Sequence, residues 1–452
     1  MQRNLKELFQ PKSVAIFGAT NKKGKIGFSL VENLSKYNGK LYYVNPRLSL
    51  ENKKIFSKKV YASILDVPIS KLDLAIIAIP SKYVVTILNE LAKKNCKNIV
   101  LISSGFNETG NNKLADDLIK TINKNNMNLI GPNCLGICNL KNNLNATFNS
   151  KKLQYPKFGN VSIISQSGAL GSAILDLAHY ESLGVNKFVS YGNALDIDEC
   201  DLLNYFYEDK STDVIFCYLE GIKNGRLFYN TLKKVCKTKK VLILKGGLSE
   251  SGNSAAKSHT AAISTSTKIF KAAIEQAGAY LVNGIEELFY LGKLFSVYKN
   301  LKINNIQLIT NGGGFGVLCS DQLDKYKIDL VSLDNKTKEE LKKILPYYSA
   351  ISNPLDLSGD ADTKKFIDCT NICLKSKKID AIAILILFQL PGIDESIIPE
   401  LIKLRKKSTK PLFILCFGGS QTNKFIEELE QNNFVCFKNP KHLAKSLSFI
   451  KI

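Results

Sequence analysis

One histidine in this sequence stands where a side chain can carry a chemical group from one place to another. His259 lies in a segment of mostly small residues that runs from Gly246 to Ala262. An apolar run, 240–244, precedes the segment, and a helical pattern begins near Thr267. Because an imidazole can act as a nucleophile and a flexible tether can move it, the arrangement predicts a histidine that accepts a phosphoryl group. An ordinary solvated loop histidine is the alternative.

The carboxylate best suited to assist that histidine is Glu220, which ends the apolar run 214–219. A strand over this run would bring Glu220 to the sheet edge where ligands of parallel sheets bind. From there the carboxylate would hold one ring nitrogen of His259 and balance the charge of a phosphoimidazole. A solvent-exposed acid at a strand end is the alternative, because spacing alone does not link the two residues.

A turn suited to phosphate follows the apolar run 161–164. A helical pattern comes next, and the first turn of a helix offers unbonded N–H groups and a positive dipole end to an anion. The serines in the turn would bond phosphate oxygens, or they would only cap the helix. The predicted phosphate-binding residues are Ser165, Gln166, Ser167 and Gly168.

A glycine-rich turn near the N terminus predicts a second ligand. Gly18, Gly24 and Gly27 follow a strand pattern and resemble a dinucleotide fingerprint. A NAD site would need an acid at the end of the second strand, where this chain has Arg47 instead. The cation favours a phosphorylated ribose, as in NADP or coenzyme A. The residues expected to converge on this cleft are Gly18, Ala19, Thr20, Lys25, Val44, Asn45, Pro46, Arg47, Ile79, Pro80, Ser103 and Gly105.

The elements that must position these residues repeat along the chain. A short apolar strand, a glycine-containing turn and a helix begin at Val14, again at Val161 and again at Ile306. Strands that alternate with helices form parallel, doubly wound sheets. We therefore predict an α/β protein with three doubly wound domains, a Rossmann-like one followed by two flavodoxin-like ones. Their expected boundaries are 1–128, 129–299 and 300–452.

The basic composition does not indicate nucleic-acid binding. The formal net charge is +22 over 452 residues, but nearly all the cations are lysines spread along the chain. We find no module in which basic and aromatic residues alternate, so a solvated surface is the better interpretation. An acidic partner subunit or a polyphosphate ligand would also benefit from this charge.

The sequence carries no signal for a membrane or an oxidising compartment. No run approaches the roughly 20 apolar residues that span a bilayer, and the first residues lack the apolar core of a secretory signal. The 11 cysteines show no paired spacing and no histidine beside them that would indicate zinc. We expect a cytoplasmic protein with reduced, mostly buried thiols and no resident metal.

Taken together, these motifs resemble those of a known family. The chain is similar to the α subunits of the NDP-forming acyl-CoA synthetases, the ADP-forming acetate–CoA ligases, and more distantly to that of succinyl-CoA synthetase. The resemblance covers essentially the whole chain. It rests on motifs that start at Pro11, Val44, Gly131, Ser165, Tyr218, Ser258, Ser352 and Phe417.

The resemblance implies a role for each part. The first domain would bind CoA, His259 would be phosphorylated, and Glu220 would stabilise it. The phosphate-binding turn would hold inorganic phosphate, and Asn133 and Cys134 would lie near the acyl group. The third domain would be the family's ligase-CoA domain. The reaction would convert acyl-CoA, ADP and phosphate into the free acid, CoA and ATP, through an acyl phosphate.

The resemblance also implies a partner. We find no ATP-grasp region, so ADP or ATP with Mg²⁺ would bind on a β subunit, in an α₂β₂ assembly. Two positions depart from the family pattern: Ala261 stands where glycine is usual, and Phe315 stands where proline is usual. Neither departure removes a reacting group, although Ala261 would stiffen the histidine segment.

Two other classes of protein remain as alternatives. A non-catalytic CoA-binding regulator of the same fold would not need both His259 and Glu220. An NADP-dependent oxidoreductase would need a hydride-transfer site, which we do not find. The identity of the acid, acetate or a branched or aryl acid, is not fixed by the sequence.

Overall fold

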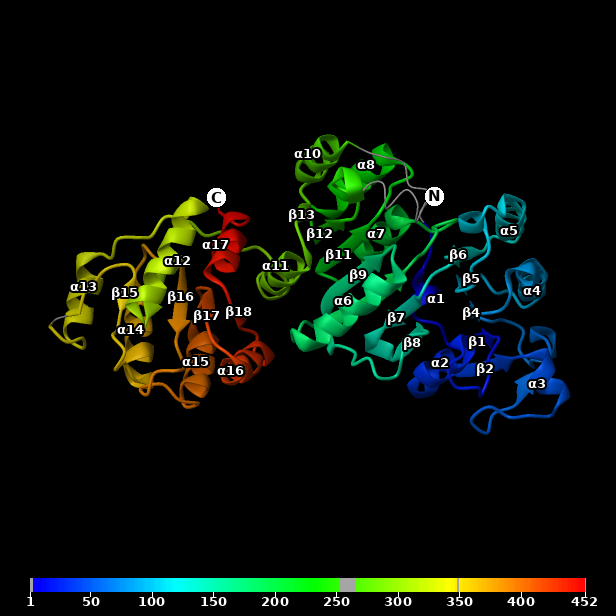
Figure 1. Ribbon diagram of the computed structural model, residues 1–452, viewed down its shortest axis with the longest axis horizontal. Helices are drawn as coiled ribbons and strands as arrows, with labels where there is room; N and C mark the ends of the chain where they lie inside the picture. Colours follow the sequence, from blue (N-terminus) through cyan, green and yellow to red (C-terminus); the bar gives the residue numbers. More distant parts are fainter. Residues whose placement is uncertain (1–2, 253–265, 348, 452) are drawn as a thin grey trace. The chain divides into compact units, whose positions relative to one another are not determined.

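The computed structural model describes residues 3–252, 266–347 and 349–451 of the chain (Figure 1). His259 and Ala261 therefore lie outside the described residues. The chain divides into two compact units, Met1–Leu288 and Phe289–Ile452. The first unit contains two sheets and the second contains one.

The first sheet has the strand order of a Rossmann fold. Its six parallel strands run in the order β3-β2-β1-β4-β5-β6, so the order reverses beside β1. The strands are β1 (Ser13–Phe17), β2 (Lys40–Val44), β3 (Val60–Tyr61), β4 (Leu74–Ile77), β5 (Asn98–Leu101) and β6 (Asn128–Ile130). The helices are α1 (Lys6–Phe9), α2 (Ile26–Asn33), α3 (Pro46–Leu50), α4 (Val84–Lys93) and α5 (Asn112–Lys124).

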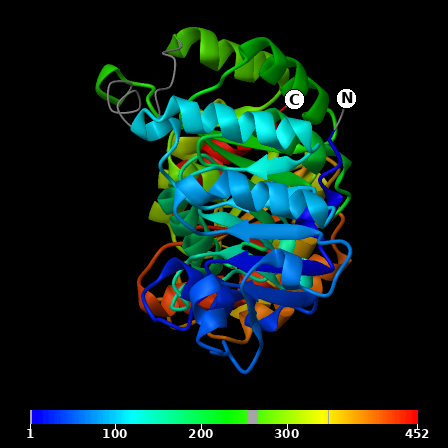
Figure 2. The same ribbon diagram turned by 90° about the vertical axis from the view of Figure 1, so that its right-hand side faces the viewer.

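Helices cover both faces of this sheet, which explains its apolar strands. All five residues of β1 and all four of β4 are buried, as a sheet covered on both sides requires. Figure 2 shows α4 and α5 lying side by side across the sheet. The helix α5 is amphipathic and turns Ala115, Leu118 and Ile122 inward.

The second sheet corrects one expectation. Its order is β13-β12-β11-β9-β10-β7-β8, and β7 and β8 run antiparallel to their neighbours, so the sheet is mixed and not wholly parallel. Asn143 closes the tight β7–β8 turn in the left-handed region, at a φ of 57°, and such a turn permits a hairpin. The strands are β7 (Gly136–Asn139), β8 (Leu144–Thr147), β9 (Phe158–Ser165), β10 (Val185–Ser190), β11 (Val214–Leu219), β12 (Lys240–Lys245) and β13 (Tyr280–Val282).

The five parallel strands of the second sheet and the third sheet share one topology. In chain order both read 2-1-3-4-5, the flavodoxin-like arrangement that the sequence predicts. The third sheet contains β14 (Ile306–Thr310), β15 (Leu355–Asp356), β16 (Ala381–Ile386), β17 (Leu412–Cys416) and β18 (Val435–Phe437). The prediction of one Rossmann-like and two flavodoxin-like sheets is therefore confirmed.

The remaining helices connect these strands. In the first unit they are α6 (Gly168–Tyr180), α7 (Glu199–Glu208), α8 (Gly225–Val235) and α10 (Thr267–Ala277). The helix α11 (Ile285–Val297) spans the boundary between the units. In the second unit they are α12 (Gly313–Lys325), α13 (Asn335–Lys342), α14 (Thr363–Lys375), α15 (Ile397–Lys407), α16 (Ser420–Gln431) and α17 (Pro440–Ser448).

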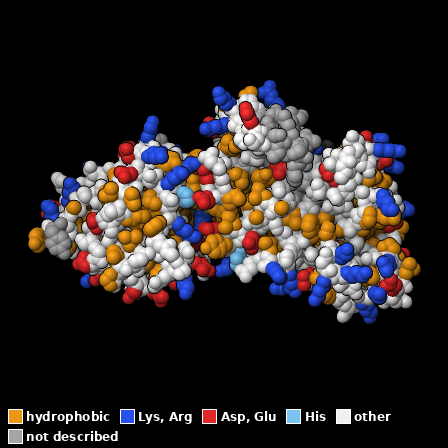
Figure 3. All heavy atoms as spheres, in the orientation of Figure 1, with side chains coloured by type: hydrophobic (Ala, Val, Ile, Leu, Met, Phe, Trp, Pro, Cys, Tyr) orange, Lys and Arg blue, Asp and Glu red, His pale blue; other side chains and the backbone are white. Residues whose placement is uncertain are grey.

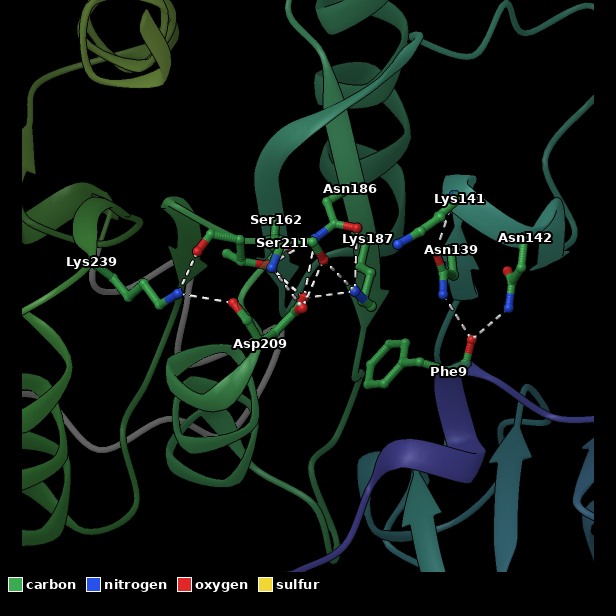
Figure 4. Close-up of polar contacts among 11 residues, drawn as sticks. Phe9, Asn139, Lys141, Asn142, Ser162, Asn186, Lys187, Asp209, Ser211 and Lys239 are labelled. Atoms are coloured by element: carbon green, nitrogen blue, oxygen red, sulfur yellow. Dashed lines mark hydrogen bonds and ion pairs between the residues drawn. The ribbon is translucent and has the colours of Figure 1, made fainter. Parts of the chain in front are cut away.

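A buried ion pair anchors the second sheet at the end where its parallel strands begin. Lys187 of β10 is 2% exposed, and its Nζ lies 2.6 Å from Oδ2 of Asp209 (Figure 4). Burial raises the pKa of Asp209, but hydrogen bonds from Lys187, Ser211 and Thr212 outweigh it and lower the pKa to about 2. Burial lowers the pKa of Lys187, and its pairing with Asp209 only partly offsets this. The pair holds the start of β10 to the segment before β11.

The substitution Asp209→Asn is expected to lower the free energy of local unfolding around β10 by about 3 kcal/mol, because it leaves Lys187 buried without its counter-charge. Hydrogen exchange of the β10 amides measures this loss. The folded-state pKa of about 2 lies below the ordinary 3.8, so the carboxylate stabilises fully above that ordinary value and loses its effect as the pH falls through 2. The difference in exchange protection between Asp209→Asn and wild type should therefore shrink as the pH falls toward 2. Equal protection near pH 7 would contradict the pairing, and adding Lys187→Met should recover part of the loss.

The surface fits the composition. In the view of Figure 3, lysine and arginine side chains are interspersed with aspartate and glutamate and form no single basic patch. All 11 cysteines are free thiols, and all but Cys236 are buried. Within residues 3–252, 266–347 and 349–451, no helix has the length and apolar character to cross a membrane.

Candidate functional site

The parallel strands of the second sheet end at one level, which creates the edge on which the site is built. Ser165, the last residue of β9, pairs in register with Ser190 of β10 and Tyr218 of β11. Leu219 pairs in turn with Lys245 of β12. The residues that follow these strands therefore lie close together, as the sequence predicts for Glu220 and the phosphate-binding turn.

Gln166 ties the phosphate-binding turn to the strand end that bears Glu220. Its Oε1 accepts the backbone N–H groups of Glu220 and Gly221, the latter at 3.0 Å, and its Nε2 donates to the Gly221 carbonyl at 3.0 Å. Its own N–H donates to the Tyr218 carbonyl at 3.1 Å. The sequence predicts that the Gln166 side chain binds phosphate, but in the structure this side chain hydrogen-bonds the backbone of Glu220 and Gly221.

Glu220 is buried at this edge and contacts two polar side chains that the sequence reasoning missed. The hydroxyl of Tyr218 donates to its Oε1 at 3.2 Å. Burial raises the pKa of Tyr218 to about 12, and the charge of Glu220 adds to the effect, so the phenol stays a donor. Tyr218 and Glu220 stand two residues apart along a strand, so they face the same side, and this spacing was the available signal.

Lys245 is the second missed residue. Its Nζ donates to the backbone carbonyl of Glu220 at 2.8 Å and to that of Gly246. Burial lowers the pKa of Lys245, and the charge of Glu220 opposes that change. Because Gly246 begins the segment that carries His259, Lys245 fixes the point where this segment leaves the sheet.

In the phosphate-binding turn, the two serine hydroxyls make hydrogen bonds within the protein, so an anion would meet mainly backbone N–H groups. The hydroxyl of Ser165 is buried and donates to the Ser167 carbonyl at 2.6 Å. The hydroxyl of Ser167 accepts the N–H of Leu170 at 3.3 Å and caps α6, as the capping alternative anticipated. An anion here would meet the N–H groups of the first turn of α6, beginning with Gly168.

The loop expected near the acyl group lies against this turn. The N–H of Leu135 donates to the hydroxyl of Ser190 at 3.1 Å. A methyl group at Gly168 would stand 3.2 Å from Cβ of Leu135, so the loop closely approaches the start of α6. Asn133 is exposed on the loop and has a positive φ of 56°. The loop and the phosphate-binding turn therefore lie side by side.

Cys134 points away from this surface. Its Sγ is buried and lies 3.3 Å from the carbonyl oxygen of Leu101, at the end of β5. Burial raises the pKa of the thiol to about 12, so it stays protonated. Of the two residues predicted near the acyl group, only Asn133 presents its side chain outward.

The expected convergence at the first sheet also follows from strand register. Phe17 pairs with both Val44 and Ile77, so the segments after β1, β2 and β4 begin at one level. Asn45 caps α3 and donates from Nδ2 to the Ala19 carbonyl at 2.9 Å, which joins two of these segments. The segments after β4 and β5 are joined in the same way by the hydroxyl of Ser103, which accepts the N–H of Ile79 at 3.2 Å and donates to the Ile79 carbonyl.

The glycines of the first turn allow close packing and leave an open surface. A methyl group at Gly18 would stand 2.3 Å from the Ala78 carbonyl oxygen, and one at Gly27 would stand 2.0 Å from that of Gly18. Gly24 has a φ of 79° and faces open space. Arg47 has a side chain 81% exposed and pairs only loosely with Glu51, at 3.4 Å. The turn and the guanidinium therefore remain accessible to an anionic ligand.

The other two histidines and Phe315 lie elsewhere. His179 is near the end of α6, with Nδ1 3.1 Å from the Tyr155 carbonyl oxygen, and His442 stacks on Tyr290 at 4.5 Å. Phe315 is buried at the start of α12, 6.1 Å from the ring of Phe417. Within the described residues, no group of three or more histidine, cysteine or acidic side chains has the arrangement of a metal site.

Three domain families match the chain in order. Residues 12–139 match the CoA binding domain, residues 158–295 match the succinyl-CoA ligase like flavodoxin domain, and residues 306–394 match the ligase-CoA domain. Each match contains one of the three sheets in whole or in large part. The domain order implied by the resemblance is therefore confirmed.

Whole-chain relatives agree with these matches. The chain is 38% identical to the α subunit of acetate–CoA ligase (ADP-forming) II of Pyrococcus furiosus, over 96% of this chain and 95% of that subunit. It is 44% identical to an acetate–CoA ligase (ADP-forming) of Methanocaldococcus jannaschii, over 79% of this chain but 49% of that protein. A 4-hydroxybutyrate–CoA ligase (ADP-forming) of Nitrosopumilus maritimus is 34% identical, over 83% of this chain and 53% of that protein. The chain thus spans nearly all of one relative and about half of the others.

A solved structure shows the same fold over nearly the whole chain. The dinucleotide-forming acetyl-coenzyme A synthetase 1 of Candidatus Korarchaeum cryptofilum, in complex with phosphate and ADP, superimposes with a TM-score of 0.91. It is 31% identical, and the match covers 99% of this chain and 96% of that one.

Proposed function

Because this chain belongs to the ADP-forming acetate–CoA ligases and matches their α subunit, we propose that it catalyses the acyl-transfer half of that reaction. Acyl-CoA, ADP and phosphate are converted reversibly into the free acid, CoA and ATP. The observation that carries the proposal is the common edge of Glu220, the first turn of α6 and the Asn133 loop. A phosphate at α6 there stands beside the acyl thioester and within reach of a tethered histidine.

The first step joins phosphate to the acyl group. A phosphate oxygen attacks the thioester carbonyl, the C–S bond breaks, and CoA leaves as its thiolate, which takes a proton. The first-turn N–H groups of α6 hold the phosphate, and the positive helix end offsets its charge. Asn133 faces the acyl group from the adjoining loop.

The second step moves the phosphoryl group to His259. A ring nitrogen attacks the phosphorus of the acyl phosphate, and the carboxylate leaves as the free acid. Glu220 accepts a hydrogen bond from the other ring nitrogen and balances the cationic phosphoimidazole. Tyr218 and Lys245 orient Glu220 through its carboxylate and its carbonyl. The segment then carries the phosphoryl group to ADP, so two distant substrates need not meet.

The substitution Glu220→Gln is expected to keep the fold and to lower the yield of phosphoenzyme and the turnover by about tenfold or more. A neutral amide can still bond Tyr218 but cannot balance the phosphoimidazole charge. Radiolabel on the protein from labelled phosphate and acetyl-CoA measures the yield. The exposed Glu208, at the end of α7, supplies the matched control Glu208→Gln, which should behave as wild type. Unchanged phosphoenzyme in Glu220→Gln would refute the proposed pairing.

The first sheet supplies the CoA site. The matched domain family binds CoA, and the cleft of Gly18, Asn45 and Ser103 lies at the edge where such ligands bind. Open space at Gly24 supports a pyrophosphate site there, and the exposed side chain of Arg47 supports contact with the phosphorylated ribose. Lys25, which precedes α2, adds a second cation at the helix start.

Calorimetry on the full chain is expected to show binding of CoA and little binding of NAD, because no acid follows β2 to bond a ribose diol. Arg47→Ala should weaken CoA binding by about tenfold, the usual value of one charged hydrogen bond. The exposed Arg226 of α8 supplies the control Arg226→Ala, which should bind CoA as wild type does. Stronger binding of NAD or NADP would favour the oxidoreductase alternative.

The acid and the nucleotide partner complete the proposal. We propose acetate as the acid and an ATP-grasp subunit, in an α₂β₂ assembly, as the site of ADP and Mg²⁺. The test is co-expression with such a subunit and measurement of acid-dependent loss of the CoA thiol across acetate, 4-hydroxybutyrate, branched and aryl acids. Acetate should give the largest kcat/KM. Binding of CoA without turnover of any acid would instead favour the regulatory alternative.

A further inference from the structure

A polar clamp, which comprises Glu108, Asn193 and Asn133, joins the loop after β5 of the first sheet to the loop expected near the acyl group. Its central residue, Asn193, lies in the segment 191–198 between β10 and α7. The N–H of Asn193 donates to the Pro132 carbonyl at 3.0 Å, and that of Leu195 donates to the Gly131 carbonyl at 3.1 Å. The segment therefore runs along the loop that carries Asn133, and backbone hydrogen bonds fix the place of Asn193 beside it.

The side chains of the clamp form a chain with a defined direction. Asn193 donates from Nδ2 to Oε2 of Glu108 at 2.5 Å and to Oδ1 of Asn107 at 3.1 Å. Its Oδ1 accepts from Nδ2 of Asn133 at 3.3 Å. A carboxylate accepts hydrogen bonds only, so Glu108 requires the NH₂ end of Asn193 to face it. The oxygen of Asn193 then faces Asn133 and requires the NH₂ end of Asn133 in turn.

Glu108 also holds the loop that follows β5. Its Oε1 accepts the N–H of Gly105 at 2.5 Å and that of Phe106 at 3.3 Å. Gly105 has a φ of 103° and belongs to the cleft assigned to CoA. Glu108 therefore contacts the loop of Gly105 through Oε1. Through Oε2 it contacts Asn193, which in turn bonds Asn133.

The backbone at the junction is held in conformations that ordinary residues avoid. Asn133 and Ala194 have φ values of 56° and 51°, in the left-handed region. A methyl group at Gly192 would stand 2.4 Å from the carbonyl oxygens of Asn133 and Pro132. Such conformations cost about 1 kcal/mol or more per residue and concentrate at functional sites. The close approach at Gly192 keeps the two segments in contact.

We propose that Glu108 and Asn193 are positioning residues that fix the polarity of the Asn133 amide at the acyl group. The inference rests on the proposed function and deepens it. With one N–H of Asn133 held by Asn193, its second N–H faces the cleft as a donor to the oxygen of the thioester carbonyl, where negative charge develops as phosphate attacks. The same clamp couples the CoA loop to that donor. Neither Glu108 nor Asn193 touches the reacting atoms.

A swap of charge and amide tests this assignment. Asn193→Asp places two carboxylates against each other, and Glu108→Gln leaves one acceptor oxygen, which cannot serve both the Gly105 N–H and the Asn193 amide. Each single change is expected to lower kcat by about tenfold or more, with KM for the acyl-CoA within about threefold, because a small misplacement of a catalytic donor costs that much.

The double variant Glu108→Gln, Asn193→Asp restores the direction of the hydrogen bonds. The amide introduced at position 108 donates to the carboxylate introduced at position 193, and that carboxylate still accepts from Asn133. The kcat of the double variant should therefore return to within about threefold of wild type.

Two further readouts separate the possible outcomes. Glu90→Gln is a matched control, since Glu90 of α4 accepts a hydrogen bond from Ser63 and makes none to Asn193 or Asn133, so its loss should leave kcat unchanged. Hydrogen exchange at Gly105 and Phe106 should rise in the single variants and recover in the double variant. A double variant no faster than the singles, or singles with wild-type kcat, would overturn the positioning role. A wild-type enzyme without any thioester formation would overturn the proposed function, whatever the exchange data show.

Discussion

The variant His259→Ala, assembled with an ATP-grasp partner, is expected to lose acid-dependent thioester formation by roughly 10³-fold or more. Removing a nucleophile leaves no group to take its place, and such losses are the largest that single substitutions cause. His259 lies outside the described residues, but the sheet edge that would receive it lies within them. At that edge Tyr218 and Lys245 both hydrogen-bond Glu220, through its carboxylate and its carbonyl.

The control for this experiment uses another of the chain's 3 histidines. His179 is exposed near the end of α6, where its ring bonds the Tyr155 carbonyl, so His179→Ala should retain wild-type turnover. The initial rate of CoA thiol loss with saturating acetate and ATP measures both variants. Turnover of His259→Ala within tenfold of wild type would show that phosphoryl transfer does not require this residue.

The second large effect concerns the partner. The purified chain without an ATP-grasp subunit is expected to form phosphoenzyme from acyl-CoA and phosphate but no net ATP. The three sheets belong to a CoA binding domain, a succinyl-CoA ligase like flavodoxin domain and a ligase-CoA domain, and the sequence contains no Gly-x-x-x-x-Gly-Lys loop. No carboxylate cluster for Mg²⁺ occurs in the part of the chain that the structure describes. A luciferase assay for ATP, with and without the subunit, measures the dependence.

ATP formation should appear on addition of the subunit and scale with it until the two are equimolar. An ATP-grasp subunit whose metal-binding carboxylates are replaced by amides is the matched control and should restore nothing. Robust ATP synthesis by the purified chain alone would reveal a nucleotide site on one of its three sheets.

The strand ends were the part of the site that the sequence predicted well. Glu220 follows an apolar run, and Ser165 ends another, so parallel pairing alone brings them to one edge. The same argument placed Gly18 and Asn45 together at the first sheet. The doubly wound fold class followed from the alternation of strands and helices. These features depend on local apolar patterns, which a single sequence displays.

Side-chain direction was less predictable, because it depends on partners far along the chain. Gln166 bonds backbone groups at residues 220 and 221, which turns its amide from phosphate toward the neighbouring strand. Cys134 turns inward because the end of β5 offers its thiol a carbonyl. The β7–β8 hairpin was missed since its polar turn resembles an ordinary loop. Glu108 and Asn193, 85 residues apart, share no pattern that a sequence shows.

The measurement that tests the account most directly is transfer of label from phosphate to this chain. Wild-type protein is incubated with radiolabelled phosphate and acetyl-CoA, without nucleotide, and then resolved under denaturing conditions. We expect label that is stable to base and labile to acid, that requires acetyl-CoA, that matches the CoA released and that is absent from His259→Ala. Label of equal amount in His259→Ala, or none in the wild type while CoA is released, would contradict it.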